Sequence, residues 1–270
     1  MESIEEIVHV IPLGHEIDRA VKPFERLKTN RVYLLAITQG QKYSLEMIER
    51  QKYFLDVVKK KLEKKGIEVQ VKNVDMFNIL EVMKNVAGII LKEKLQNNIV
   101  YVNMSACGRL TSVGATLAAM AHDARIYYVV ADRYSKTEEE ENIHGLSICD
   151  RLRVVYLENF RLRLPDEISL TILIKLCERD KGLKTKEILD LLGQMRIKGF
   201  EEDYTRLIGQ ERRKTQIRQL MKLNKGILDR LERSGYITRV KTGRYNTIKI
   251  TESGKYVAYI SGLFKQTYTR

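Results

Sequence analysis

Short apolar runs alternate with longer amphipathic stretches over the first 160 residues. The apolar runs are rich in Val, Ile and Tyr and span residues 7–13, 32–37, 67–74, 99–104, 126–131 and 154–157. Unbroken apolar runs of this length are typical of strands buried on both faces of a parallel sheet. Between them, apolar positions recur at helical spacing over 44–65, 76–95 and 108–122. The pattern predicts a Rossmann-like, doubly wound, mainly parallel α/β domain over residues 1–160.

A second, smaller domain is predicted over residues 165–270. Its pattern indicates three helices, then two strands that meet at a Gly-containing turn, then a last helix, over 165–176, 185–193, 216–234, 236–240, 245–250 and from 252 onward. Three helices followed by a β-hairpin is the order of a winged helix-turn-helix domain. Residues 194–215 are too many for a simple turn. Either an extra helix is inserted around 202–213, or the second helix is misplaced.

Positive charge is concentrated in this second part. The chain has 48 Lys and Arg against 35 Asp and Glu, a net charge of +13. Residues 1–164 contain 25 basic and 22 acidic residues (net +3), whereas residues 165–270 contain 23 and 13 (net +10). Such an asymmetry indicates nucleic acid or a membrane surface as a partner, although a solvated basic surface is the simpler alternative.

Several classes of protein are excluded at this stage. The chain has no apolar run of about 18 residues, which a transmembrane helix needs, and its acidic start lacks the basic segment of a signal peptide. The three cysteines lie far apart, which argues against disulfides or a zinc site and predicts a cytoplasmic protein. No GxGxxG or GxxxxGK[ST] motif occurs, so a standard dinucleotide cofactor or a P-loop is not expected.

Cations on the third predicted helix and on the hairpin are the candidate DNA contacts. A helix in the major groove and a hairpin beside it can together neutralise several phosphates. Lys222 and Arg218 are expected to read bases, and Arg244 to contact the backbone. The full set of candidates is Arg212, Arg213, Lys214, Arg218, Lys222, Lys225, Arg239, Lys241 and Arg244.

The loops after the predicted strands are the candidate ligand site, because ligands of doubly wound sheets bind at the carboxyl ends of the strands. The loop after the fourth strand leads through small and polar residues into a helix. The N–H groups at the start of that helix, with Arg109, suit an anion. The small residues also suit close helix–sheet packing. The candidates are Leu13, Gly14, His15, Thr38, Gln39, Asn103, Ser105, Ala106, Cys107, Gly108, Arg109, Asp132 and Arg133.

Two stretches resemble known families. Residues 226–237 (GILDRLERSGYI) and 250–255 (ITESGK) are similar to winged-helix regulators related to MarR. Residues 102–109 (VNMSACGR) resemble the Asn-x-Thr/Ser-Gly-Gly-x-Lys/Arg signature of CARF domains, the CRISPR-associated Rossmann-like sensors, with Ala106 and Cys107 in place of the two glycines. The order of domains resembles the archaeal CARF–HTH transcription regulators.

The resemblance implies a homodimer that binds a cyclic oligoadenylate across its two-fold axis, with cyclic tetra-adenylate favoured. A two-fold dimer also suits a palindromic operator in duplex DNA. Two alternatives stay open: a CARF-type ring nuclease that degrades the ligand, and a winged-helix regulator of another nucleotide or metabolite. No metal-ligand spacing or nucleophile motif is visible, so neither catalytic residues nor a metal or cofactor is predicted. The acidic segment 137–145 is expected to be a solvated loop or, less plausibly, a lid.

Overall fold

The computed structural model describes residues 5–264 except 41, 180, 243 and 244. It divides into two units, Met1–Arg163 with Ile260–Arg270, and Leu164–Tyr259. The first unit is built on a sheet of six strands with the order β3-β2-β1-β4-β5-β8. The strands are β1 (Ile7–Pro12), β2 (Arg31–Ala36), β3 (Glu68–Asn73), β4 (Ile99–Asn103), β5 (Arg125–Val129) and β8 (Val154–Leu157).

The first five strands are parallel, and β8 pairs antiparallel with β5. The predicted mainly parallel, doubly wound sheet is confirmed. The chain runs outward from β1 to β3 and then returns to place β4 on the other side of β1. The reversal of strand order therefore lies between β1 and β4.

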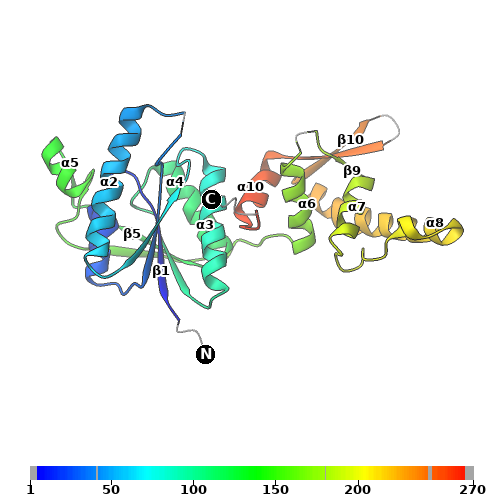
Figure 1. The fold of residues 1–270 in the computed structure, drawn as a ribbon, viewed down its shortest axis with the longest axis horizontal. Coiled ribbons are helices and arrows are strands. Elements are labelled where there is room, and N and C mark those ends of the chain that lie inside the picture. Colours follow the sequence, from blue (N-terminus) through cyan, green and yellow to red (C-terminus); the bar gives the residue numbers. More distant parts are fainter. Residues whose placement is uncertain (1–4, 41, 180, 243–244, 265–270) are drawn as a thin grey trace. The chain divides into compact units, whose positions relative to one another are not determined.

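Helices cover both faces of this sheet (Figure 1). The face of α2 is built from apolar residues at helical spacing, with Ile48, Leu55, Val58 and Leu62 buried. The Ser44 hydroxyl accepts a hydrogen bond from the Met47 amide and begins that helix. The helices are α1 (Asp18–Val21), α2 (Leu45–Glu63), α3 (Ile79–Lys94) and α4 (Arg109–Ala121).

The acidic segment forms a helix rather than a loop. Helix α5 (Glu138–His144) lies between the short paired strands β6 (Arg133–Tyr134) and β7 (Ser147–Ile148). The Thr137 hydroxyl accepts a hydrogen bond from the Glu140 amide, and the acidic residues of the first turn suit the positive end of the helix dipole. The prediction of a loop was wrong because four consecutive glutamates were interpreted as solvated chain.

The second unit has the order of elements of a winged helix domain, as predicted. Its three-stranded sheet has the order β10-β11-β9. The elements are α6 (Glu167–Cys177), β9 (Leu183–Lys184), α7 (Thr185–Gln194), α8 (Gly209–Leu223), α9 (Asp229–Arg233), β10 (Ile237–Thr242), β11 (Tyr245–Ile250) and α10 (Glu252–Ile260). The short strand β9 was not predicted; it pairs with β11 through Leu183 and Lys184.

The third helix begins earlier than predicted. Helix α8 starts at Gly209 and continues through a π-helical turn at Asn224–Leu228 into α9, whereas the sequence pattern placed the start at 216. The second helix, α7, lies where it was predicted. The intervening residues 195–208 contain a 3₁₀ turn, Tyr204–Arg206, rather than an inserted helix. The first turns of α8 are polar, so apolar periodicity did not reveal them.

The last described residues contact helices of the first unit. The His122 Nε2 atom lies 2.7 Å from the Ile260 carbonyl oxygen. Gly262, with φ of 70°, lies so close to α3 that a Cβ there would be 3.0 Å from the Ala87 carbonyl carbon.

Gly254 is a position in the winged helix unit that has no room for a small added group. A Cβ at this position would lie 2.1 Å from the Tyr236 carbonyl oxygen and 2.7 Å from Ile250 Cγ1. Gly254→Ala is therefore expected to lower the free energy of unfolding by about 1–3 kcal/mol in denaturant titrations. Gly226→Ala is the matched control, because a Cβ there meets nothing within 4 Å and alanine favours the helix. Equal effects of the two substitutions would contradict the close approach at Gly254.

Candidate functional sites

The loops that follow β1 and β4 are joined at the reversal of strand order. The Gly14 amide donates a hydrogen bond of 2.7 Å to the Ala106 carbonyl oxygen. From α2, Gln51 Nε2 donates to the Leu13 carbonyl oxygen at 3.1 Å. Leu13 and Ala106 are fully buried. These candidates thus lie at the carboxyl ends of β1 and β4, the place where doubly wound folds bind ligands.

Asn103 and Ser105 hold the loop after β4 from inside the protein. The Asn103 side chain is fully buried; its Nδ2 donates to the Arg19 carbonyl oxygen, and its Oδ1 accepts from the Ser105 amide and hydroxyl. The Ser105 hydroxyl also accepts from the Val129 amide. Both side chains have internal partners, so their role in this structure is to hold the loop, not to contact a ligand directly.

The start of α4 is different, because it is open. Gly108 is the N-cap residue, it is exposed, and it has no side chain to accept the first N–H groups of the helix. The first turn contains no acidic residue. Arg109 is exposed and makes no hydrogen bond or ion pair with the described residues. A cation at the positive end of a helix dipole is unfavourable by itself, and a bound anion reverses that cost.

His15 and Cys107 flank this opening, and both are electrically neutral. The His15 ring stacks on Phe54 with centroids 4.7 Å apart. Burial and the nearby Arg50 lower the pKa of His15, and Glu141 opposes them. Burial raises the pKa of the Cys107 thiol to about 12. A thiol that stays protonated at neutral pH is a poor nucleophile.

The other ligand candidates follow β2 and β5 and have partners of their own. Asp132 accepts hydrogen bonds from the Arg151 amide and the Arg153 guanidinium. Arg133 pairs with Glu140 at 2.6 Å, at the base of α5. The Thr38 and Gln39 amides follow β2 and donate to the Asn73 side chain, one strand away from the reversal.

Sequence reasoning missed a buried charged cluster directly after the β1 loop. The Glu16 carboxylate accepts from the amide and hydroxyl of Ser147, and Asp18 accepts from the Cys149 amide and pairs with Lys22 at 2.9 Å. Burial raises the pKa of Glu16. These contacts fix the α5 excursion to the β1 loop, which disfavours a mobile lid. The available signal was the density of charges in residues 15–19, next to an apolar strand.

His9 makes the stability of the first unit depend on pH. Its ring is fully buried and stacks on Tyr101 with centroids 4.8 Å apart, and burial lowers its pKa to about 3. The unfolded chain binds a proton near pH 6.5 and the folded chain does not, so the stabilisation is complete above that pH and is lost as pH falls toward 3.

We therefore expect the free energy of unfolding of His9→Phe to depend less steeply on pH at acid pH than that of the wild type. Between about pH 6 and 4, the difference in free energy of unfolding between the wild type and His9→Phe should change by up to about 1.4 kcal/mol per pH unit. Urea titrations at several pH values measure it. The other titrating groups are common to both proteins, and parallel pH profiles would contradict the assignment.

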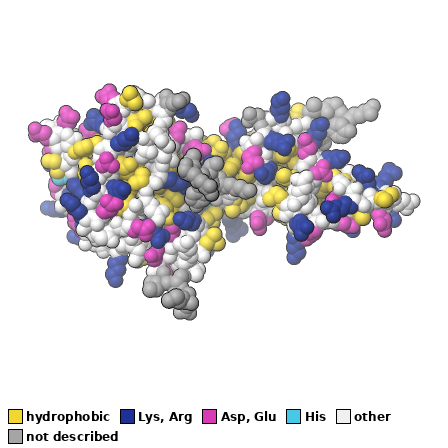
Figure 2. All heavy atoms as spheres, viewed as in Figure 1, with side chains coloured by type: hydrophobic (Ala, Val, Ile, Leu, Met, Phe, Trp, Pro, Cys, Tyr) yellow, Lys and Arg dark blue, Asp and Glu magenta, His cyan; other side chains and the backbone are white. Residues whose placement is uncertain are grey.

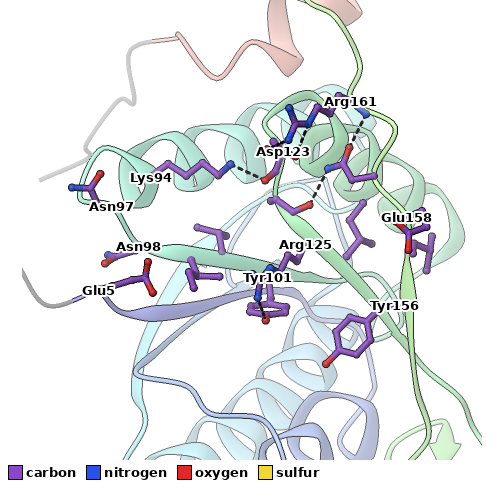
Figure 3. Close-up of a pocket in the computed structure, with 16 residues that line it drawn as sticks. Glu5, Lys94, Asn97, Asn98, Tyr101, Asp123, Arg125, Tyr156, Glu158 and Arg161 are labelled. Atoms are coloured by element: carbon purple, nitrogen blue, oxygen red, sulfur yellow. Dashed lines mark hydrogen bonds and ion pairs between the residues drawn. The ribbon is translucent and has the colours of Figure 1, made fainter.

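The first unit also contains a hollow of about 820 Å³ at the opposite end of the sheet, by the amino ends of β4 and β5 (Figure 3). Its cations already have partners: Lys94 Nζ donates to the Asp123 carbonyl oxygen at 2.7 Å, and Arg161 pairs with the Asp123 carboxylate at 3.0 Å. Arg125 bonds the Tyr101 hydroxyl. Because Glu5 and Glu158 also line the hollow, it suits a polyanion less well than the start of α4 does.

In the second unit, the predicted DNA-contacting cations fall into two groups. One group has internal partners: Arg218 pairs with Glu202, Lys222 lies over the Phe200 ring at 5.1 Å, and Arg239 pairs with Glu232 at 3.3 Å. The other group is exposed and makes no hydrogen bond or ion pair with the described residues; it comprises Arg212, Arg213, Lys214, Lys225 and Lys241. Arg244 lies outside the described residues.

Arg212, Arg213 and Lys214 lie in the first turns of α8, Lys225 lies in the π-helical turn that continues it, and Lys241 lies on β10. Figure 2 shows Lys and Arg side chains over α8, with hydrophobic and some acidic side chains among them. Exposed cations gathered on one helix suit contact with a nucleic-acid backbone. Over the described residues, no helix has the length and apolar character to cross a membrane.

Comparisons with known families match both parts of the chain. Residues 7–134 match the family described as HFX_2341_N-like, N-terminal. Residues 168–262 match the DUF6293 C-terminal winged helix domain. The second match confirms the predicted winged helix domain, and the first shows a separate family domain before it. No curated protein matches the chain.

Solved structures show only distant similarity. Can2 from Sulfobacillus thermosulfidooxidans in complex with cyclic tetra-adenylate is 17% identical, with a TM-score of 0.38 over 94% of this chain and 61% of that chain. Csm6 from Enterococcus italicus, bound to cyclic hexa-2'-fluoro-hexa-dAMP, is 12% identical, with a TM-score of 0.39 over 86% and 59%. This chain thus spans about three fifths of the length of either.

Proposed function

Because this chain joins an HFX_2341_N-like N-terminal domain to a DUF6293 C-terminal winged helix domain, we propose that the protein is a ligand-responsive, DNA-binding transcription regulator. Its effector is an anionic nucleotide bound at the carboxyl end of the sheet. Its reader is the basic surface along α8. The observation that carries the proposal is the open start of α4, where exposed Arg109 stands at a positive helix end without an acid or a capping side chain.

The effector we propose is a cyclic oligoadenylate, with cyclic tetra-adenylate favoured. This rests on the resemblance of residues 102–109 to the CARF signature. Phosphates carry the negative charge that the start of α4 lacks, and its N–H groups are oriented to receive them. A two-fold dimer would present this site twice, so an even-membered cyclic ligand would meet both halves identically. The same symmetry would suit a palindromic operator.

We propose binding without cleavage, because the side chains at the opening suit positioning more than chemistry. His15 is stacked and its pKa is lowered, Cys107 stays protonated, and Ser105 is held inside by Asn103. A ring nuclease would need a group poised to activate a ribose hydroxyl. The alternative is tested by the same experiment as the binding function.

The experiment combines binding and product analysis. The full chain is titrated with cyclic tetra-adenylate by calorimetry, its affinity for duplex DNA is measured with and without the ligand, and the nucleotide is recovered for mass spectrometry. The proposal expects ligand binding, an intact ring and a changed DNA affinity, because the ligand site and the DNA site of a ligand-responsive regulator are coupled. Linear products would favour the nuclease. Binding of other nucleotides but of no cyclic oligoadenylate would leave a regulator with a different effector.

A further inference from the structure

The outward face of α8 has an apolar centre. Ile217 and Met221 are 49% and 52% exposed, and one helical turn separates them. Thr215 and Gln219, on either side of Ile217 in sequence, are buried. Positions two apart on a helix point about 200° apart, so Ile217 lies on the side opposite the packed face. The same holds for Met221, two residues before buried Leu223.

Exposed cations surround this pair. Arg213 precedes Ile217 by four positions and Lys214 by three, so both share its face of the helix. Lys225 is exposed four positions after Met221. An apolar centre with cations beyond it at both ends is the arrangement of a helix that meets base edges in the middle and phosphates at its margins.

The residues expected from the sequence to read bases point elsewhere. Arg218 pairs with Glu202, and Lys222 lies across Gly199 onto the Phe200 ring. Both side chains lean toward the loop that precedes α8. Extending either toward a base would break a contact, whereas Ile217 and Met221 have no such contact to lose.

We propose that Ile217 and Met221 read thymine, by contact with the 5-methyl groups that thymines present in the major groove. The inference rests on the proposed DNA-binding function and extends it to the kind of base recognised. Duplex DNA is favoured over a second copy of this chain, because two such faces brought together would place cations against cations at both ends of the contact. Like charges at such a contact are repulsive.

The test replaces thymine by deoxyuridine, which lacks the methyl group and keeps the same hydrogen-bonding atoms. Duplexes are first selected from a random pool by the full chain, and each thymine is then replaced singly. For the wild type, the replacement at a contacted position should weaken binding about fourfold, the value of one buried methyl group. The Ile217→Ala/Met221→Ala variant should bind thymine and deoxyuridine duplexes equally.

Met195→Ala is the matched control, because Met195 is 46% exposed in the same unit and lies at the end of α7; it should keep the preference for thymine. Salt-dependent binding of the wild type that is indifferent to every replacement would overturn this inference and leave the DNA-binding function in place. No duplex binding at all would overturn both. If the double variant kept the thymine preference but lost self-association, the face would be assigned to a second copy of this chain. If it kept the preference but lost binding to phosphatidylserine vesicles, the face would be assigned to a membrane surface.

Discussion

Binding of the full chain to duplex DNA is expected to fall steeply with salt. The exposed cations Arg212, Arg213, Lys214, Lys225 and Lys241 have no internal partner among the described residues. If each neutralises one phosphate, counterion release predicts a slope of about −4.5 in log K against log salt for each bound chain. Between 50 and 200 mM salt, that slope corresponds to a roughly 500-fold loss of affinity for each bound chain. Fluorescence anisotropy across a salt series measures it.

The slope of log K against log salt shows which cations contact DNA more directly than the affinity at one salt concentration does. The Arg213→Ala/Lys214→Ala variant should reduce its magnitude by about 1.8, whereas Arg230→Ala should leave it unchanged, because Arg230 pairs with Asp166 at 2.6 Å. A fragment of residues 1–164 should not bind. Equal binding by that fragment, or equal slopes for both variants, would remove the basic helix from the interface.

Arg109→Ala is expected to weaken binding of cyclic tetra-adenylate by about ten- to a hundred-fold in calorimetry. A charge-assisted contact with a phosphate is worth about 1.5–3 kcal/mol, which corresponds to that range of dissociation constants. The ligand-free variant should also be more stable by about 0.3–1 kcal/mol, because a cation leaves the positive end of the α4 dipole. Opposite signs for binding and stability are characteristic of an anion site.

Arg133→Ala is the control for this prediction, since Arg133 already pairs with Glu140 on the same side of the unit. It should change ligand affinity less than threefold, which is under about 0.7 kcal/mol. If Arg109→Ala bound the ligand as tightly as the wild type does, the ligand site would lie elsewhere than at the carboxyl ends of β1 and β4.

The backbone plan of this protein was predictable from local patterns. The apolar runs at 32–37 and 99–104 lie within a residue or two of β2 and β4, and the hairpin after residue 235 marked the winged helix. Hydrophobic periodicity is a property of neighbouring residues, and it buries one face of a helix or strand whatever the element packs against. The open start of α4 was also visible, because Gly108 and Arg109 are adjacent in the chain.

The partners of polar side chains were not predictable in this way. Arg218 and Glu202 are 16 positions apart, and Asn103 and Arg19 are 84 apart. A charge pattern shows that a cation is present, but whether it faces solvent or a carboxylate depends on where a distant loop packs. For this reason the sequence favoured Lys222 and Arg218 as the residues that contact bases, and only the folded structure showed that Ile217 and Met221 are exposed on the outward face of α8. Hydrophobic periodicity is local, whereas charge pairing depends on contacts between segments that are distant in the sequence.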